Sequence, residues 1–182
     1  MIILASASPT RAKMLREAGI AFTQRPADFD EEALDHSCPR EFVYRATEGK
    51  AASALKLYGD SLPLLCADTV VTADDHILRK PKNIDDARRI LGRQSGNSVG
   101  ILTCTILHKK NLRLIDLSET RYFFNPFDPA DLETYLQSDL WRDKAGGCMV
   151  EGFCKRYIRQ VQGFESTAMG LTLEAIAPFL EG

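Results

Sequence analysis

Apolar and polar positions at the start of the chain predict a strand, a tight loop and a helix in succession. Residues 1–5 form a short apolar run typical of a buried strand, and the small residues Ser6 and Ser8 favour a turn. Pro9 suits the first helical position because its missing N–H would have no partner there, and Ser8 is a good N-cap. Apolar residues at helical spacing then continue to Gly19, a helix stop. Free N–H groups at this helix start favour an anion site.

Arg11 is an unusual residue for the first turn of this helix. A cation there opposes the helix dipole, and a phosphate bound in front of the loop would explain it. An exposed arginine on an ordinary first helix is the alternative, and the spacing alone leaves both open.

The rest of the chain alternates between helical and strand patterns. Strands are predicted over 20–24, 64–71, 76–81, 99–108, 112–124 and 148–161, and helices over 39–58, 84–94, 129–137 and 171–180, with a loop over 163–170. The fold class expected is α/β: a mixed twisted sheet flanked by helices, with a cleft between two lobes. Residues 1–182 are expected to form a single domain.

Asp68 interrupts the apolar run of residues 64–71. An ionised carboxylate in a core strand costs free energy unless it is paired or bound to a metal. Ligands of α/β sheets usually bind at strand ends. We therefore interpret Asp68 as a functional residue, with a structural ion pair as the alternative.

Further charged residues lie before and within the helix predicted over 39–58. The acidic run comprises Asp28, Asp30, Glu31, Glu32 and Asp35. Such a run is typical of a solvated loop, and the alternative is that one or two of its carboxylates face a divalent metal. Lys50 lies beside the apolar stripe of the helix, where a lysine usually extends to water.

Composition and charge disfavour several classes of function. The chain has 182 residues, 45% of them hydrophobic and 26% charged, with a formal net charge of −2. That balance argues against bulk binding to nucleic acid or to a membrane surface, so any anion site must be local. No apolar run reaches the length of a membrane span and no signal peptide is evident, so a cytoplasmic location is expected. The five cysteines are irregularly spaced, which favours reduced thiols, and no cluster suggests zinc.

Several short motifs occur in a fixed order along nearly the whole chain. They are L-A-S-A-S-P-T-R (4–11), F-D-E (29–31), G-K-A (49–51), A-D-T-V-V (67–71), R-K-P (79–81), D-K-A-G-G-C-M-V-E-G-F (143–153) and M-G-L-T-L (169–173). Together they resemble the motifs of the Maf family of nucleoside triphosphate pyrophosphatases, also described as septum-formation inhibitor proteins. The number and order of the motifs make the resemblance specific.

The resemblance implies a hydrolase that cleaves a nucleoside triphosphate between the α and β phosphates, giving a monophosphate and pyrophosphate. It implies Asp68 as general base and metal ligand, Glu31 as a second metal ligand, Mg²⁺ or Mn²⁺ as cofactor, and a homodimer. The residues it places on phosphate are Ser6, Ser8, Arg11, Lys50, Lys80 and Lys144. Phosphoryl transfer needs charge neutralisation and an oriented water more than a covalent catalyst, which suits this set.

The residues expected to select the nucleobase do not agree. Position 151 is a glutamate, as in the family members that resemble 7-methyl-GTP pyrophosphatases. A carboxylate can accept hydrogen bonds from the two donors on the guanine edge. Thr10 is not the aromatic residue expected to stack on a methylated purine, and Thr69 is the residue of the dTTP and UTP group. A surface ion pair of Glu151 with Lys155 or Arg156 is the alternative to a role in base recognition.

Two other functions are considered. A phosphatase or kinase with the same serine loop is disfavoured because the chain lacks G-x-x-x-x-G-K-[ST]. A nucleotide-binding regulator of cell division without turnover would not need Asp68 as a base.

Overall fold

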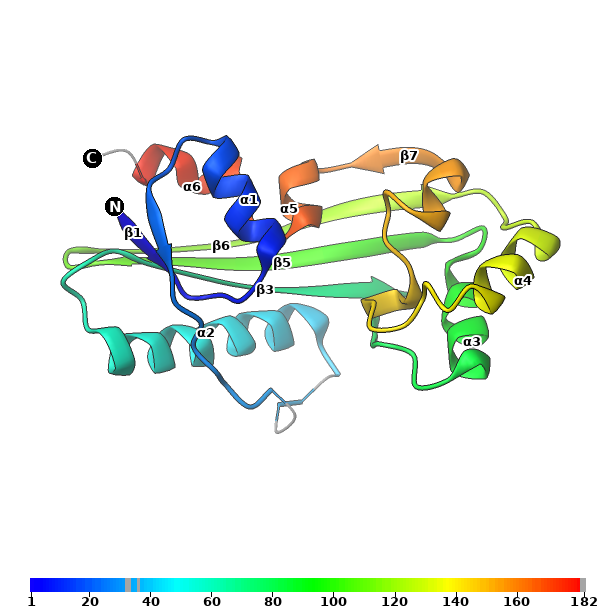
Figure 1. Ribbon diagram of the computed structural model, residues 1–182, viewed down its shortest axis with the longest axis horizontal. Coiled ribbons are helices and arrows are strands. Elements are labelled where there is room, and N and C mark those ends of the chain that lie inside the picture. Colours follow the sequence, from blue (N-terminus) through cyan, green and yellow to red (C-terminus); the bar gives the residue numbers. More distant parts are fainter. Residues whose placement is uncertain (32–33, 36, 181–182) are drawn as a thin grey trace. The chain divides into compact units, whose positions relative to one another are not determined.

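The structure is a computed structural model and describes residues 1–31, 34–35 and 37–180. Its elements alternate between helix and strand over most of the chain (Figure 1). In chain order they are β1 (Ile2–Leu4), α1 (Pro9–Glu17), β2 (Phe22–Gln24), α2 (Pro39–Tyr58), β3 (Leu64–Ala73), β4 (His76–Leu78), α3 (Ile84–Gln94), β5 (Ser98–Lys109), β6 (Leu112–Phe124), α4 (Pro129–Gln137), η1 (Ala145–Gly147), η2 (Phe153–Tyr157), β7 (Ile158–Gln162), α5 (Glu165–Met169), α6 (Leu173–Ile176) and η3 (Ala177–Phe179), the η segments being 3₁₀ helices.

The strands in the described residues form one mixed sheet of order β2-β1-β3-β5-β6-β7, with β4 paired to β3. Strand β1 runs parallel to both β2 and β3, whereas β4 is antiparallel to β3 and β7 is antiparallel to β6. The predicted α/β class, with a mixed sheet and flanking helices, is therefore confirmed. The cleft between two lobes stays a prediction.

Side-chain caps explain where several predicted helices begin. The Ser8 hydroxyl accepts a hydrogen bond from the Arg11 N–H, and Asn83 Oδ1 accepts one from the Asp86 N–H. Asp128 accepts from two N–H groups in the first turn of α4. Each cap satisfies donors that a helix start would otherwise leave unpaired. The helix α2 begins at Pro39 as predicted, without a side-chain cap.

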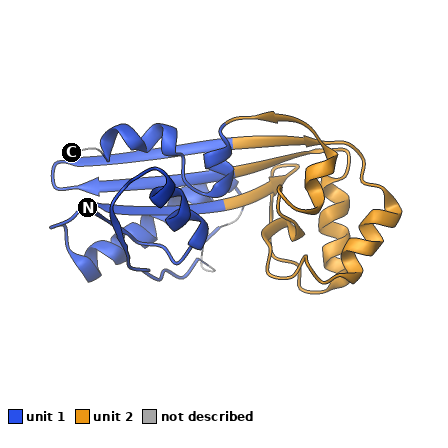
Figure 2. Cartoon of the chain, turned by 45° about the horizontal axis from the view of Figure 1, so that its top comes forward, with its two compact units in different colours: residues 1–69, 102–119, 164–182 blue, residues 70–101, 120–163 orange. Residues whose placement is uncertain are grey.

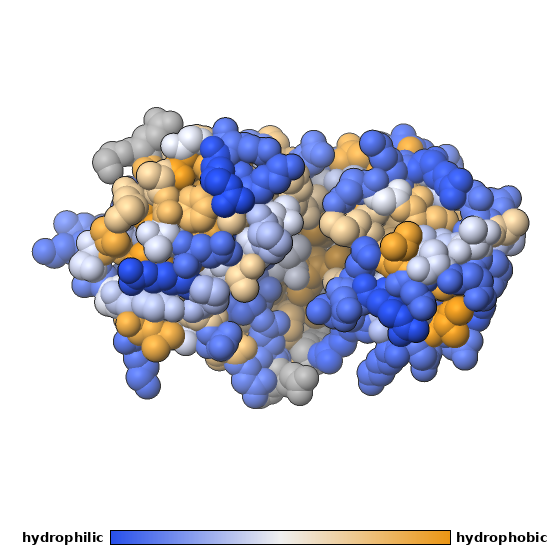
Figure 3. Space-filling view, in the orientation of Figure 1, coloured by the Kyte–Doolittle hydropathy of each residue, from blue (hydrophilic) through white to orange (hydrophobic). Residues whose placement is uncertain are grey.

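The chain divides into two compact units, coloured separately in Figure 2, and each is described by itself. Unit 1 comprises residues 1–69, 102–119 and 164–182, and unit 2 comprises residues 70–101 and 120–163. On the face seen in Figure 3, hydrophilic residues predominate and hydrophobic ones are scattered among them. Among the described residues, no helix combines the length and the apolar character that crossing a membrane would require.

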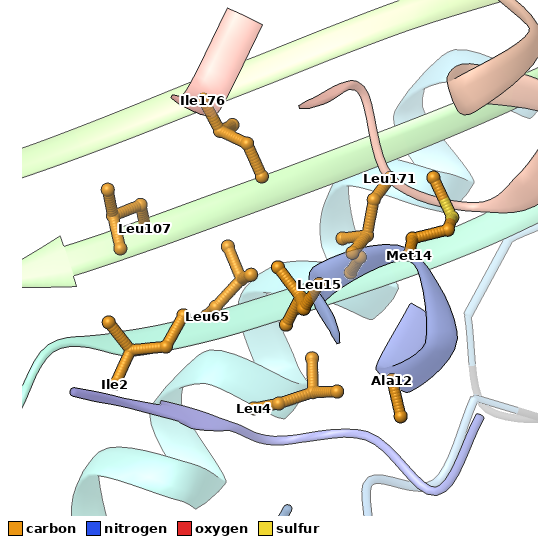
Figure 4. Packing of buried hydrophobic residues seen from close by; sticks show 10 residues of the cluster. Ile2, Leu4, Ala12, Met14, Leu15, Leu65, Leu107, Leu171 and Ile176 are labelled. Atoms are coloured by element: carbon orange, nitrogen blue, oxygen red, sulfur yellow. The ribbon is translucent and has the colours of Figure 1, made fainter. Parts of the chain in front are cut away.

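The core of unit 1 brings distant parts of the chain together. Figure 4 shows side chains from β1, α1, β3 and β5 packed with residues that follow α5. Leu15 on α1 and Leu171 after α5 are fully buried in this cluster. Burying side chains of this size stabilises the fold by about 1.5–3 kcal/mol each. The packing also places the start of α1 beside residue 170, so that Arg11 can donate to the Gly170 carbonyl.

Unit 2 contains the predicted strand that the structure does not bear out. Of the strand predicted over 148–161, only the last part is present, as β7. Residues 148–157 form a turn and the 3₁₀ helix η2 in its place. A disulfide joins Cys148 to Cys154 and closes this segment into a loop. Phe153 stacks on Tyr135 at a ring-centroid distance of 4.5 Å, which fixes the loop against α4. The strand-like sequence pattern is overridden by these two constraints.

Two differences concern the last part of the chain. The segment expected to be a loop over 163–170 contains the short helix α5. The helix predicted over 171–180 is split into α6 and the 3₁₀ turn η3. Pro178 lies in η3 and lacks the N–H that a continuing α-helix would use, which accounts for the split.

The disulfide also corrects the expectation that all the cysteines are reduced. Cys38, Cys66 and Cys104 are free, and only Cys38 among them is exposed. Burial raises the pKa of the Cys66 thiol to about 12 and that of Cys104 to about 11. Because the thiolate is the reactive form, neither buried cysteine is suited to act as a nucleophile.

Thiol counting tests this assignment directly. The native protein is expected to react with a thiol reagent at one cysteine, Cys38, and the unfolded protein at three unless it is first reduced. Reduction after unfolding should expose all five cysteines. Mass spectrometry of the labelled peptides provides the measurement, and five labelled thiols without reduction would contradict the disulfide.

Candidate active site

Asp68 lies on β3 and is 9% exposed. Its Oδ2 accepts a hydrogen bond from Lys50 Nζ at 2.8 Å, and its Oδ1 accepts one from the N–H of Thr69 at 2.9 Å. A carboxylate has about four acceptor positions, so these two bonds leave room for a further donor such as water. The carboxylate that interrupts the apolar strand is thus paired and still able to bind another group.

Lys50 on α2 connects Asp68 to the acidic segment. Its Nζ forms an ion pair with Glu31 as well as with Asp68. The side chain of Lys50 is mostly buried, so the alternative that it simply extends to water is wrong, and its contact with phosphate stays a prediction. One ammonium thus lies between two carboxylates, and the Arg11 guanidinium is attracted to the same two groups. Glu32, in the same acidic run, lies outside the described residues.

Arg11 is held by three acceptors from separate parts of unit 1. Its Nε donates to the Gly170 carbonyl at 2.8 Å, one terminal nitrogen donates to Ser6 Oγ at 3.0 Å, and the other donates to Thr69 Oγ1 at 3.0 Å. The alternative of an exposed arginine on an ordinary helix is therefore wrong. The serine loop, β3 and the chain after α5 meet at this guanidinium.

Gly170 permits the close approach of this backbone to Arg11. Its φ of +103° lies in a region that other residues rarely adopt, and an added Cβ would lie 3.1 Å from Arg11 Nε. The motif M-G-L therefore has a structural role, because its glycine brings the Gly170 carbonyl to the Arg11 guanidinium.

Three threonine residues extend the network away from Arg11. Thr103 Oγ1 donates to the Thr167 carbonyl at 2.7 Å, so the hydrogen of the 2.9 Å contact between Thr69 Oγ1 and Thr103 Oγ1 must come from Thr69. The Thr69 hydroxyl thus accepts from Arg11 and donates to Thr103, which fixes its orientation. The predicted substrate contact of Thr69 stays a prediction, because the hydroxyl is already engaged within the protein.

Burial of Arg11 creates an electrostatic imbalance. Its pKa is lowered from the ordinary value because burial disfavours the charged form, although attraction to Asp68 and Glu31 opposes this effect. The surrounding groups therefore do not fully replace the hydration that the guanidinium loses. An anion bound near Arg11 would supply the missing stabilisation.

The serine loop is ordered by side chains on both sides. Ser6 Oγ accepts from the Ser8 N–H at 3.2 Å and from Arg11, and Gln24 donates to the Ser6 carbonyl at 2.8 Å. Thr10 lies in the first turn of α1 and is partly exposed. The Ser8 cap already engages the Arg11 N–H, so the anion site expected at this helix start stays a prediction.

Lys80 and Lys144 belong to unit 2, where their backbone segments are joined. The N–H of Gly146 donates to the Arg79 carbonyl at 3.2 Å, and Gln94 donates to the Gly146 carbonyl. Lys80 is exposed and lines a cavity of about 450 Å³, whose other basic residues are Arg79 and Lys82 after β4 and Arg89 and Arg93 on α3. Lys144 donates from its Nζ to the Leu140 carbonyl. The motifs R-K-P and D-K-A-G-G are thus adjacent within unit 2.

Glu151 is exposed in the loop that the disulfide closes. Among the described residues Glu151 forms no ion pair with Arg156, which pairs with Asp131 at 2.9 Å, so that alternative is not borne out. No ion pair of Lys155 is found within the described parts of the chain either. The carboxylate of Glu151 is therefore available to a ligand.

Some residues that shape the site are not evident from the sequence. Gly170, Thr103 and Thr167 hold the Arg11 network, and their contacts depend on chain segments far apart in sequence. Gln94 could have been identified from the sequence, because it is a polar residue on the same face of α3 as the buried residues Ile90 and Leu91. A polar residue at such a position usually has a fixed partner.

The side chains near Asp68 can be compared with the ligands that a divalent metal ion requires. Within residues 1–31, 34–35 and 37–180, no group of three or more side chains of the metal-binding types comes together. Mg²⁺, however, commonly uses one or two carboxylates and completes its shell with water and substrate phosphates. Glu31 and Asp68 meet at the same ammonium, so this pair fits such a site.

The family model described as Maf-like protein matches residues 1–182. The chain belongs to this family. A Nitratiruptor protein named nucleoside triphosphate pyrophosphatase is 54% identical over 179 residues, covering 97% of each chain. Relatives with the same name from Helicobacter pylori and Campylobacter jejuni are 41% and 36% identical, covering 96% and 99% of this chain and 92% and 100% of their own. The family predicted from the motifs is confirmed.

Among solved structures, a protein of Vibrio cholerae, VC0702, superposes with a TM-score of 0.48 at 16% identity. The match covers 99% of this chain and 94% of the other. The likeness is too distant to bear on function.

Proposed function

We propose that this Maf-family protein hydrolyses a nucleoside triphosphate between its α and β phosphates, releasing a nucleoside monophosphate and pyrophosphate. The observation that carries the proposal is the cluster in unit 1: Asp68 and Glu31 share Lys50, and Arg11 is fixed beside the serine loop. The names of the curated relatives support the same reaction. We further propose that residues 1–182, all matched by the family model, form one functional domain.

Asp68 is assigned as the general base. It takes a proton from a water whose oxygen then bonds to the α phosphorus, while the bond from that phosphorus to the bridging oxygen breaks and pyrophosphate leaves. The Lys50 ammonium and the Thr69 N–H hold the carboxylate in one orientation, which is the requirement for aiming a water.

Arg11, Ser6 and Ser8 are assigned to phosphate binding. The guanidinium and the positive end of the α1 dipole provide positive charge near the base, since Arg11 donates to Thr69, the residue that follows Asp68. Lys50 neutralises further phosphate charge. Lys80 and Lys144 are assigned the same role on the evidence of their motifs.

Glu31 and Asp68 would hold a divalent cation, Mg²⁺ or Mn²⁺. When bound, such an ion neutralises charge on the phosphate oxygens. The pairing of both carboxylates with Lys50 keeps them near each other in its absence.

A turnover assay tests the function. Nucleoside triphosphates incubated with the protein and Mg²⁺ or Mn²⁺ should yield monophosphate and pyrophosphate, resolved by ion-exchange chromatography. Excess EDTA should stop the reaction. Release of inorganic phosphate without pyrophosphate would identify a phosphatase, binding without turnover would favour a regulator of cell division, and turnover in EDTA would remove the metal from the assignment.

For the base, we propose a guanine-type preference that includes 7-methyl-GTP. The support is Glu151, an exposed carboxylate without an ion-pair partner among the described residues. It can accept from the N1–H and the N2 amino group of guanine, whereas uracil and thymine present carbonyl oxygens that it would repel. A preference for dTTP or UTP is the competing proposal, supported by Thr69.

Glu151→Gln is expected to shift the ratio of kcat/KM toward UTP or dTTP by about tenfold or more, the scale of one mispaired polar group. An amide can match both the N3–H and the carbonyl of a pyrimidine. Glu165→Gln, at another exposed glutamate, is the control. A parent protein that already prefers UTP or dTTP over every guanine nucleotide contradicts this assignment.

The homodimer stays a prediction from the family resemblance. Light scattering on the purified protein measures the mass that decides it.

A further inference from the structure

The acidic segment that carries Glu31 follows α2 through three successive contacts. The Tyr58 hydroxyl donates to the Pro26 carbonyl at 2.6 Å, near the end of α2. The Phe29 ring lies against Gly49, and Glu31 then pairs with Lys50. Pro26 therefore contacts the last residue of α2, whereas Phe29 and Glu31 contact the neighbouring residues Gly49 and Lys50 in the middle of the helix.

The contact between Phe29 and Gly49 depends on the missing side chain of the glycine. A Cβ added to residue 49 would lie 2.4 Å from both Cε2 and Cζ of the Phe29 ring, and 2.5 Å from Cδ2. Carbon atoms that are not bonded to each other do not come this close, so any larger residue at this position would displace the ring. The ring therefore rests on helix backbone that only glycine exposes.

This contact is immediately next to the catalytic cluster. Gly49 precedes Lys50 in α2, and Phe29 lies two residues before Glu31. Only Asp30 separates the two residues, so we expect a displaced ring to shift Glu31 as well. Phe29 is half-buried and is not among the residues of the cluster shown in Figure 4.

We propose that Phe29 and Gly49 are a pair of positioning residues: the ring seated on the glycine sets Glu31 against Lys50, and thereby sets the geometry of the Glu31, Lys50 and Asp68 cluster. The proposal rests on the function proposed above. It adds two residues that touch neither substrate nor metal and act through Glu31.

A pair of matched substitutions tests the contact. Gly49→Ala and Gly92→Ala make the same change within a helix, but a Cβ at Gly92 meets nothing within 4 Å. We expect Gly49→Ala to lower kcat/KM about tenfold because it displaces Glu31, and Gly92→Ala to leave it within about twofold. Circular dichroism and thermal melting of each variant establish that it is folded. Equal activity of the two variants overturns the proposal.

The ring is tested by combining substitutions. Phe29→Ala should itself lower kcat/KM, and adding Gly49→Ala to it should cost less than about twofold more, because the alanine no longer meets a ring. Phe29→Leu, which keeps an apolar side chain, should recover part of the activity. Additive losses in the double variant contradict a shared mechanism. This arm also covers the case in which Gly49→Ala alone fails to fold.

A third arm separates positioning from simple stabilisation. In a Glu31→Gln background, Gly49→Ala should change kcat/KM by less than about twofold, since its effect passes through Glu31. A general structural defect would lower activity in both backgrounds and overturns the proposal. The function proposed above fails in a different way: the unsubstituted protein would not hydrolyse any nucleoside triphosphate, or Glu31→Gln would leave its turnover unchanged.

Discussion

Asp68→Asn is expected to lower kcat by about 10²- to 10⁴-fold, the usual contribution of a positioned general base, while the protein remains folded. The amide has nearly the same shape as the carboxylate. Its single oxygen can still accept from the Thr69 N–H or from Lys50, so one of the two hydrogen bonds is kept while the amide N–H₂ faces the other donor. What the variant loses is the negative charge and the ability to take a proton from water.

The measurement is steady-state kinetics with pyrophosphate detection, together with a thermal melt. Asp85→Asn is the control, because the Asp85 side chain is 86% exposed and pairs with Arg88 on the surface of α3. The control should keep its activity, since exposed pairs of this kind contribute little. Near-normal kcat in Asp68→Asn excludes it as the base. A variant that no longer folds would show that Asp68 is structural.

Sequence signals were most informative where a local rule determines the structure. Serine, asparagine and aspartate before apolar repeats predicted the starts of α1, α3 and α4, and the side-chain caps are present. The hairpin of β5 and β6 followed from two apolar runs around a polar turn. These features depend on residues within a few positions of one another.

Predictions failed where distant residues decide the structure. The segment after Cys148 has a strand-like pattern, but the link to Cys154 and the stacking of Phe153 on Tyr135 form a loop in its place. Likewise, nothing local identifies Gly170 as a partner of Arg11, since that contact spans 159 positions. Such contacts follow from the packing of the sheet and helices and not from hydrophobic periodicity.

In the candidate site, too, some residues could be predicted from local sequence and others could not. Asp68 could be singled out because a lone carboxylate in an apolar run demands a partner, and the structure supplies Lys50. Lys50 itself carried no such signal, since a lysine beside an apolar stripe usually reaches water. Its burial arises because two separate segments, β3 and the acidic loop, each bring a carboxylate to it.

The second large effect is expected at Arg11. Arg11→Lys should raise KM for a nucleoside triphosphate by about 10- to 100-fold, equivalent to the loss of one or two charge-assisted hydrogen bonds. A lysine keeps the charge but not the planar fork that reaches the Gly170 carbonyl, Ser6 Oγ and Thr69 Oγ1 together. Arg16→Lys, on the exposed side of the same helix, is the control and should leave KM unchanged.

Ligand-linked stability gives an independent measurement of the same site. The pKa of Arg11 is lowered because burial outweighs the attraction of the nearby carboxylates, so a bound polyphosphate would offset a cost present in the free protein. Inorganic tripolyphosphate is therefore expected to raise the melting temperature of the parent protein, with a stabilisation of about 2.7 kcal/mol at a hundred times its Kd. In Arg11→Lys the same concentration should give a much smaller rise. Equal shifts in the two proteins would place the anion elsewhere and remove Arg11 from phosphate binding.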